Sequence, residues 1–228
     1  MTGVAGLFFT GTDTGVGKTF VTAAVARLLR GQGRPVRVCK PVATGARQVD
    51  GRWISDDTLT LAEAAGAAGE WERLTPWTFP EPAAPPVAAR AAGQQLALAD
   101  LAGAVRRQAQ PGAALLVEGV GGLLCPLTET ETVADLAAEL GLPLVVVARR
   151  SLGTLNHTLL TLEVARGRGL PVAGVVVSET ARPEGLAEET NVEELRRRIA
   201  VPLLAVVPHG EPAAVAAVDW WALGERRG

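Results

Sequence analysis

The glycine-rich stretch at residues 11–19, GTDTGVGKT, contains the residue types of a phosphate-binding loop. It lies between an apolar segment, residues 4–9, and a helical pattern, residues 20–29, so it joins a predicted strand to a predicted helix. Glycines let successive N–H groups face a phosphate, Lys18 can reach the outer phosphates, and Thr19 can offer its hydroxyl to Mg²⁺. The stretch therefore predicts nucleotide binding, and the alternative is a glycine-rich turn without a ligand.

The loop departs from the usual spacing at one position. In G-x-x-x-x-G-K-[ST] the first glycine would be residue 12, where this chain has Thr12, and Gly11 comes one residue earlier. The match is therefore to a variant of the motif. The nucleotide contacts predicted in this loop are Thr14, Gly15, Val16, Gly17, Lys18, Thr19 and Phe20.

Two more charged residues stand at the ends of apolar segments. Lys40 ends residues 35–40, and Glu118 ends residues 113–118, which a glycine-rich stretch follows. In a parallel sheet the carboxyl ends of strands line the ligand crevice, so both side chains are predicted near the phosphate-binding loop, with Glu118 as a Mg²⁺ ligand. The alternatives are a solvated surface lysine and a glutamate that only begins a loop. Neighbouring positions in the predicted site are Thr44, Gly119, Val120 and Gly121.

An acidic pair opens another helical segment. Residues 55–65, SDDTLTLAEAA, place apolar residues at helical spacing after Ser55, Asp56 and Asp57. Ser55 or Asp56 is the predicted N-cap, and Asp57 then lies in the first turn. From position alone, these carboxylates are better explained as partners of the helix dipole than as metal ligands.

Continuous apolar runs later in the chain predict the architecture. Residues 144–148, 172–177 and 203–207 do not alternate polar with apolar side chains, which is typical of strands buried on both faces. Helical patterns occur at residues 87–92, 98–108, 155–166 and 191–199. The predicted fold is α/β, a doubly wound and mainly parallel sheet with helices on both faces, forming one domain over residues 1–228.

Two segments fit this pattern less well. Residues 74–86 carry five of the fifteen prolines and are predicted to be an extended surface connection without regular structure, a candidate lid. Residues 213–227 place two tryptophans near two arginines, which suits an amphipathic membrane anchor or a helix packed on the domain. Asp219 and the short length favour the packed helix.

Composition limits the classes of partner. The formal charge is −2, which gives no electrostatic argument for nucleic acid or an anionic membrane as a partner. The N-terminus lacks the pattern of a signal peptide, so a cytoplasmic protein is expected. Two cysteines and two histidines, Cys39, Cys125, His157 and His209, are too few and scattered for a structural zinc site, and the cysteines are expected to be reduced.

Several motifs together resemble one enzyme family. GTDTGVGKT, KPVATG, DTLTL, VEGVGGLLCPL and ARRSLGTLNHTLLT occur in the order found in dethiobiotin synthetases, from residue 8 to about residue 180. The resemblance implies a reaction that depends on ATP and Mg²⁺. In it, a cyclic urea closes on 7,8-diaminononanoate with CO₂ as the carbon donor.

The resemblance also implies roles for the residues already named. Lys18 holds the phosphates, and Lys40 bridges a carbamate and the γ-phosphate as the second catalytic lysine. Thr19, Asp57 and Glu118 are similar to the family's magnesium-binding set, which raises Asp57 from a dipole partner to a ligand. Thr44 falls where the family has a small hydroxyl residue that contacts substrate.

One position departs from the family pattern. Ser178, followed by Glu179, stands where the family often has an asparagine that contacts the adenine. A serine hydroxyl replaces a paired donor and acceptor, so selectivity for the base is expected to be weaker. Pro208, His209 and Gly210 resemble the family's other base-contacting loop.

A helix start after the run 144–148 resembles the family's carboxylate anchor. In the family this anchor is supplied across a two-fold interface, which implies a homodimer. Free N–H groups at a helix start suit a carboxylate, whereas the alternative is an ordinary loop with Thr154 as a helix cap. The implied substrate contacts are Leu152, Gly153, Thr154 and Asn156.

The main alternative function is that of a deviant switch ATPase, the class that positions plasmids or the division site. Those proteins resemble this chain in their sheet and glycine loop, but they carry a signature lysine where this chain has Asp13. A related amidoligase of cofactor synthesis is a second alternative, although such chains usually carry an added glutaminase domain.

Overall fold

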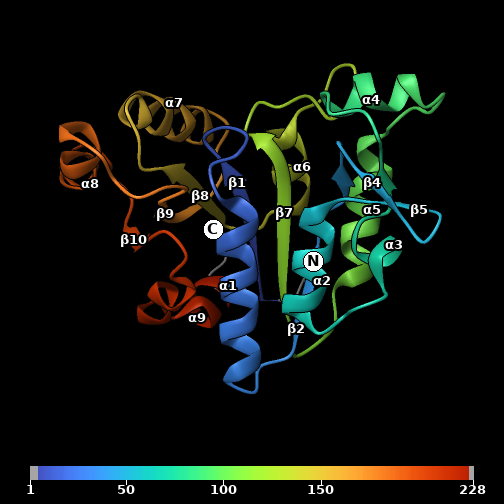
Figure 1. Cartoon of the computed structure of the whole chain (residues 1–228), viewed down its shortest axis with the longest axis horizontal. Helices are drawn as coiled ribbons and strands as arrows, with labels where there is room; N and C mark the ends of the chain where they lie inside the picture. Colours follow the sequence, from blue (N-terminus) through green and yellow to red (C-terminus); the bar gives the residue numbers. More distant parts are fainter. Residues whose placement is uncertain (1–4, 226–228) are drawn as a thin grey trace.

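The central element of the protein is a six-stranded sheet with the order β10-β9-β8-β1-β7-β2 (Figure 1). The computed structural model describes residues 5–225. Every pairing in this sheet is parallel, which confirms the predicted mainly parallel α/β fold. The strands are β1 (Gly6–Gly11), β2 (Val36–Cys39), β7 (Ala114–Gly122), β8 (Leu144–Arg149), β9 (Val172–Ser178) and β10 (Leu203–Val207).

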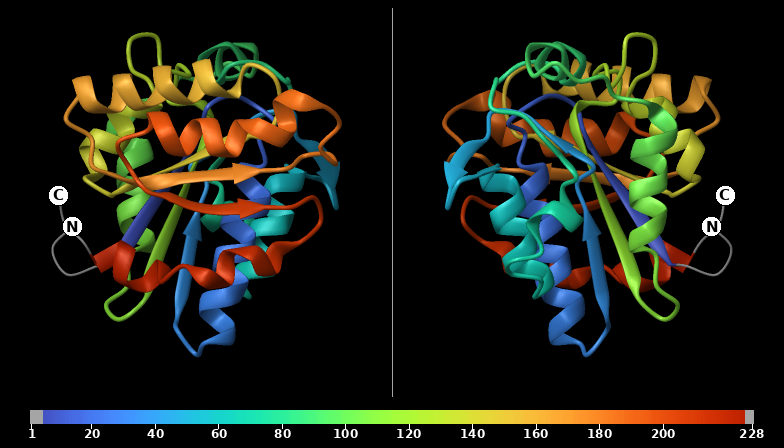
Figure 2. Two further views of the ribbon diagram at one scale, coloured as in Figure 1. Left: turned by 90° about the vertical axis from the view of Figure 1, so that its left-hand side faces the viewer. Right: turned by 90° about the vertical axis from the view of Figure 1, so that its right-hand side faces the viewer.

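The sheet is buried on both faces because its strands are mainly apolar and do not alternate polar with apolar side chains. In β1, Leu7 and Phe9 pack into one hydrophobic cluster, whereas Phe8 packs into another on the opposite face. Figure 2 shows helices on both sides of the β9–β10 edge. One face is covered by α1 (Lys18–Gly31), α2 (Asp56–Ala65), the 3₁₀ helix η1 (Pro212–Ala217) and α9 (Trp220–Glu225). The other carries α5 (Leu98–Gln108), α6 (Val133–Leu140), α7 (Thr154–Gly167) and α8 (Leu186–Arg198).

The prediction that residues 74–86 lack regular structure is wrong. The helix α3 (Trp71–Leu74) ends there, β6 (Trp77–Thr78) pairs with β3 (Val42–Ala43), and α4 (Pro85–Ala91) begins there. Phe79 is buried, so the segment is packed on the domain. Proline is tolerated in the first turn of a helix, which is where two of these prolines lie in α4.

Two further boundaries differ from the sequence pattern, and some elements were not predicted. The strand β7 continues through residues 119–122, and Gly119 packs closely there, since a Cβ would lie 3.0 Å from Val133 and 3.1 Å from Phe8. The helix α8 begins at Leu186, five residues before the predicted start. Neither α6 nor the hairpin of β4 (Arg47–Val49) and β5 (Arg52–Ile54) was predicted.

The C-terminal segment packs back on the domain, as predicted. Trp220 is buried, its indole N–H donates to the Val215 carbonyl, and its ring centroid lies 6.2 Å from that of Phe9. Arg226 and Arg227, like the first residue of the predicted strand 4–9, lie outside the described residues. None of the helices described in residues 5–225 is long and apolar enough to cross a bilayer.

Candidate active site

The phosphate-binding loop joins β1 to α1, and glycine is required at two of its positions. Gly17 is the N-cap of α1 with φ of 92°, in the left-handed region. A Cβ on Gly11 would lie 2.6 Å from the Asp13 carbonyl oxygen and 2.9 Å from Lys18 Nζ. Gly11 is therefore the position where the loop backbone and Lys18 leave no space for a side chain. This explains why the motif tolerates Thr12 at the next position.

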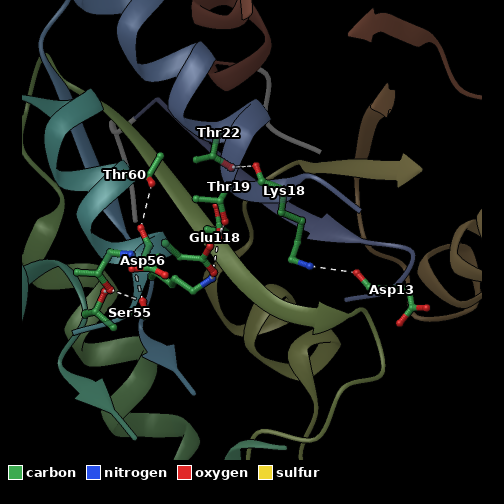
Figure 3. Close-up of polar contacts among 12 residues, drawn as sticks. Asp13, Lys18, Thr19, Thr22, Ser55, Asp56, Thr60 and Glu118 are labelled. Atoms are coloured by element: carbon green, nitrogen blue, oxygen red, sulfur yellow. Dashed lines mark hydrogen bonds and ion pairs between the residues drawn. The ribbon is translucent and has the colours of Figure 1, made fainter. Parts of the chain in front are cut away.

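Lys18 lies inside this loop. Its Nζ donates to the Asp13 carbonyl at 3.1 Å, as Figure 3 shows, and its side chain is buried. Burial lowers the pKa of Lys18, and the nearby carboxylate of Glu118 partly offsets this. An anion bound in the loop would stabilise the charged form of Lys18.

Lys40, Asp57 and Glu118 form one polar cluster beside the carboxyl end of β2, with Glu118 on the neighbouring strand β7 and Asp57 in α2. Lys40 Nζ donates to Asp57 Oδ2 at 2.6 Å and to Glu118 Oε1 at 2.7 Å. The Thr19 hydroxyl donates to the same Glu118 oxygen at 2.8 Å, and Figure 3 shows Thr19 beside Glu118. Lys40 is 3% exposed and Glu118 is 0% exposed, so Lys40 is not a solvated surface lysine.

Local sequence explains how Asp57 reaches this cluster. Ser55 is the N-cap of α2, because its side chain accepts from the Thr58 N–H, and this decides between the two predicted caps. Asp57 then lies in the first turn of α2, on the side that faces Lys40.

The charges of the cluster support one another. Burial alone would lower the pKa of Lys40, but Glu118 and Asp57 together raise it to about 12. Burial opposes ionisation of Asp57, yet attraction by Lys40 lowers its pKa below the usual value. At neutral pH Lys40 is therefore an ammonium and Asp57 a carboxylate.

The second oxygen of Glu118 fits a metal ion. Glu118 Oε2 is buried and has no hydrogen-bond partner among the described residues, which is rare for a buried carboxylate oxygen. No group of three or more His, Cys, Asp or Glu side chains forms a metal site within residues 5–225. A cation here would take oxygens from Thr19, Asp57 and Glu118 and complete its shell with water and phosphate, which suits Mg²⁺.

A cavity of about 330 Å³ lies over the cluster. Phosphate-loop residues form one wall, and Lys40, Thr44 and Asp57 form another, so the structure brings the predicted phosphate and substrate residues around one space. Val16 and Gly119 line no part of this cavity. Its lining residues are Thr14, Gly15, Gly17, Lys18, Thr19, Phe20, Lys40, Thr44, Asp57, Val120, Gly121 and Thr180.

A second cavity of about 390 Å³ adjoins the first, since Thr14 and Gly121 line both. Leucine, valine and cysteine side chains form much of its wall, and α7 contributes one side. An aliphatic chain would bury its surface favourably there. The residues lining it are Thr12, Asp13, Thr14, Gly121, Gly122, Leu123, Leu124, Cys125, His157, Leu160, Thr161 and Val164.

The residues predicted to contact the base lie together at the ends of β9 and β10. Ser178 is buried against the phosphate loop, so that a Cβ on Gly17 would lie 2.4 Å from its hydroxyl oxygen. Glu179 Oε1 accepts from Arg150 at 2.5 Å, and Glu179 Oε2 accepts from the backbone N–H of His209 at 3.4 Å. Both oxygens of Glu179 are thus engaged by the protein.

The helix start predicted as a carboxylate anchor is the N-terminus of α7. Gly153 is its N-cap with φ of 92°, and Leu152 is 84% exposed. Thr154 makes no side-chain capping bond, and its buried hydroxyl has no partner among the described residues. The cap interpretation of Thr154 is therefore wrong. Asn156 is exposed in the first turn.

Known proteins resemble this chain over most of its length. The family model described as "AAA domain" matches residues 5–214. The ATP-dependent dethiobiotin synthetase of Anaeromyxobacter dehalogenans (strain 2CP-C) is 47% identical over 203 residues, covering 89% of each chain. The chain belongs to the dethiobiotin synthetase family. The synthetases of Aromatoleum aromaticum and Bacillus licheniformis are 41% and 40% identical, cover 92% of this chain, and are themselves covered to 94% and 88%.

Solved structures with this fold include proteins of the class considered above as the main alternative, the deviant switch ATPases. The septum site-determining protein MinD complexed with Mg-ADP from Pyrococcus horikoshii gives a TM-score of 0.57 at 20% identity, covering 96% of this chain and 88% of that one. A ParA family ATPase from Chlorobium tepidum gives 0.56 at 14% identity, with 98% and 91% covered. Identity this low shows the shared fold alone, whereas the sequence relatives assign the chain to the dethiobiotin synthetase family rather than to the switch ATPases.

Two residues near the site, Arg150 and Thr180, were not singled out from the sequence. Thr180 lines the phosphate cavity, and Arg150 bonds Glu179. The available signal for Arg150 was its place just after the apolar run 144–148, at the crevice end of a strand. The same reasoning had selected Lys40 and Glu118.

Proposed function

We propose that this chain makes dethiobiotin, in an ATP-dependent ring closure of 7,8-diaminononanoate with CO₂. The observation that best supports this function is the position of Lys40, whose buried ammonium is held by two carboxylates beside the phosphate loop. One N–H of its three remains for an anion in the cavity. The proposal includes a cytoplasmic location and small-molecule partners, with no nucleic acid or membrane.

The chemistry requires fixed charges more than a protein nucleophile. One substrate amine takes up CO₂ and loses a proton to give a carbamate. A carbamate oxygen then attacks the γ-phosphate of ATP, which forms a mixed carbamic-phosphoric anhydride and releases ADP. The second amine then closes the ring and expels phosphate. Lys18 would hold the phosphates, and Lys40 would neutralise the carbamate and the transferring group. Thr44 would orient the substrate from the cavity wall.

Thr19, Asp57 and Glu118 would hold Mg²⁺, as the unpartnered Glu118 oxygen and the oxygen donor set support. The ion would supply charge neutralisation at the phosphate oxygens of ATP.

Asp57→Asn is expected to raise the Mg²⁺ concentration that gives half-maximal turnover by roughly tenfold, because hard cations depend on carboxylate charge. Glu118→Gln should act in the same direction without unfolding the domain. Magnesium titrations of the variants against wild type measure the effect, and Asp56→Asn is the matched control because Asp56 bonds the exposed Arg47. A magnesium titration unchanged in Asp57→Asn would leave Asp57 as a helix-start residue.

The two adjoining cavities suit the two parts of this substrate. Its amines would lie near Lys40, and its aliphatic chain would lie in the apolar cavity beside Leu160 and Val164. A chain of this length needs an anchor for its carboxylate at some distance from Lys40. The first turn of α7 supplies backbone N–H groups and the Thr154 hydroxyl, which has no hydrogen-bond partner within residues 5–225.

A homodimer would bring this anchor to the substrate of the partner chain. Leu152 and Leu160 are 84% and 57% exposed, and Leu124, which lines the apolar cavity with Leu160, is 50% exposed. Large exposed apolar side chains gathered near one helix favour an interface. Leu152, Gly153, Thr154 and Asn156 would then complete the site of the other subunit.

Ser178 is expected to weaken the preference for ATP over other nucleoside triphosphates. An enzyme rejects a wrong base when that base leaves a buried polar group without a hydrogen-bond partner. Ser178 has only one hydroxyl, close to Gly17, so a wrong base would leave few polar groups unpaired there. Glu179, Pro208, His209 and Gly210 would supply the remaining contacts. Values of kcat/KM for ATP, CTP and GTP measure the preference, and a preference for ATP of several orders of magnitude would contradict the role of Ser178.

The direct test of the function measures ADP release with each substrate omitted in turn. Turnover should require the diamine and CO₂ together. ATP turnover that needs neither would favour a switch ATPase.

A further inference from the structure

Arg150 joins three segments of the protein through one guanidinium. Its Nη1 donates to Glu179 Oε1 at 2.5 Å, and its Nε donates to the Glu188 carbonyl at 2.6 Å. Nη2 lies 3.5 Å from the Glu189 carbonyl. The end of β8, the end of β9 and the first turn of α8 therefore share one side chain.

The backbone around Arg150 extends this network in two directions. The Arg150 N–H donates to the Ser178 carbonyl at 2.9 Å. This bond joins Arg150 to the region of the predicted base contacts, Ser178, Glu179 and residues 208–210, which we call the base side. Asn191 Nδ2 donates to the Ser151 carbonyl at 3.0 Å, and the same carbonyl accepts from the Thr154 N–H. The turn into α7, residues 151–153, is thus tied to α8 on one side and to Arg150 on the other.

The network is shielded enough to hold a defined geometry. The Arg150 side chain is 19% exposed and that of Glu179 is 8% exposed. A charge-assisted bond at low exposure is stronger and more directional than a surface ion pair. Glu179 also accepts from the His209 N–H, so Arg150 acts on the loop after β10 through Glu179.

Only arginine can make this set of contacts. Its planar fork presents donors in several fixed directions at once, whereas a lysine ammonium is a single point charge. Arg150 also lies between the base side and the turn at residues 151–153. Stabilising α8 on the sheet would not by itself require this position.

We propose that Arg150 is a positioning residue, which holds the base-side pair Glu179 and His209 in register with the 151–153 turn at the carboxylate anchor. The inference rests on the proposed function of those two regions. Arg150 touches neither Lys18 nor Lys40, so it acts on the placement of both ligands rather than on the reacting groups.

The test replaces Arg150 with methionine, which keeps much of the length and removes the donors. We expect KM for ATP and KM for diaminononanoate each to rise about tenfold, as for loss of hydrogen bonds to a charged group, with kcat changed less than about threefold. Arg150→Lys should fall between methionine and wild type. Arg168→Met is the matched control, because it removes another arginine–carboxylate pair, with Asp135 at 2.8 Å, outside both cavities.

A diamine of the same chain length without the carboxylate separates positioning from general damage. For this analogue the KM of Arg150→Met should equal that of wild type, since no carboxylate needs the anchor. Equal increases in KM for the acid and the analogue would overturn the proposal, as would unchanged KM values for both ATP and the acid. If Arg150→Met does not fold, Arg150→Lys takes its place under the same criteria.

Calorimetry of ADP binding keeps this inference separate from the proposed reaction. If wild type shows no diamine-dependent turnover, the reaction is wrong, and the effect of Arg150 on the base side is still measured as ADP affinity. A tenfold loss of ADP affinity in Arg150→Met, absent in Arg168→Met, would support its role on that side, and equal affinities would overturn it.

Discussion

Replacing Lys40 with alanine is expected to lower turnover roughly 100-fold or more, as for removal of one fixed charge beside a developing anion. Lys40 is the ammonium nearest to both Asp57 and Glu118, and it faces the cavity that Lys18 enters from the loop. Lys40→Arg should not restore the rate fully, because a planar fork is larger than an ammonium and directs its donors differently. Steady-state turnover at saturating ATP, diamine and bicarbonate measures the loss.

The Lys40→Ala variant is also expected to be less stable than wild type. Glu118 is fully buried and would lose its ammonium partner. Breaking a buried pair by removing one member costs about 3–5 kcal/mol of unfolding free energy. Denaturant unfolding with and without Mg²⁺ measures this cost, which the cation should partly offset by occupying the carboxylates. Near-wild-type turnover and stability together would contradict the role of Lys40.

The pH dependence of this stability has a defined sign. The pKa of Lys40 is raised from 10.5 to about 12, after burial is outweighed by Glu118 and Asp57. The folded state then binds the proton more tightly than the unfolded state, so the contribution is complete below about 10.5 and is lost as pH rises through about 12. Lys40→Ala should lack this alkaline component of the stability profile.

Much of the site could be predicted because position in a parallel sheet is readable from sequence. Lys40 and Glu118 each follow an apolar run, and parallel strands end at one edge, so their convergence follows from topology. Asp57 could not be placed in this way, because the packing of α2 against α1 and β2 is a tertiary contact with no local signal. Only the family resemblance indicated it.

The contacts around Glu179 and residues 74–86 could not be predicted for a related reason. Proline content describes local backbone preference, but Phe79 is buried by packing that proline content does not report. The pair between Arg150 and Glu179 joins residues 29 positions apart, and either could have faced solvent. Composition did contain one unused signal. Lys18 and Lys40 are the two lysines of the chain, whereas arginine supplies the other 20 of its 22 basic residues.

Activity is expected to return when an inactive Lys40→Ala subunit is mixed with an inactive Gly153→Val subunit. In a dimer with shared sites, a heterodimer combines the intact Lys40 of one chain with the intact α7 N-terminus of the other. One of its two sites is then complete and the other carries both defects. Random exchange of subunits at equal amounts should therefore restore about a quarter of wild-type activity.

Gly153 is a suitable position for this experiment because its φ is 92° and a Cβ would meet only the His157 ring, at 3.8 Å. Valine is strained in this conformation, so it should disturb the turn and the N–H groups that it presents. Asn156→Asp is a second variant for the same test. It is nearly isosteric and exposed, and it places a negative charge where the substrate carboxylate would bind.

Heterodimers must be verified before the result is interpreted, for example with differently tagged subunits purified in sequence. Purified heterodimer should have about half the wild-type activity per dimer, since one site of two is complete. Each parent variant alone should stay inactive, and a mixture of Lys40→Ala with Lys18→Ala should not recover, because Lys18 and Lys40 of one chain line the same cavity and both changes lie on the same side of the proposed shared site. Complete inactivity of verified heterodimers with both Gly153→Val and Asn156→Asp would mean that each chain builds its site alone.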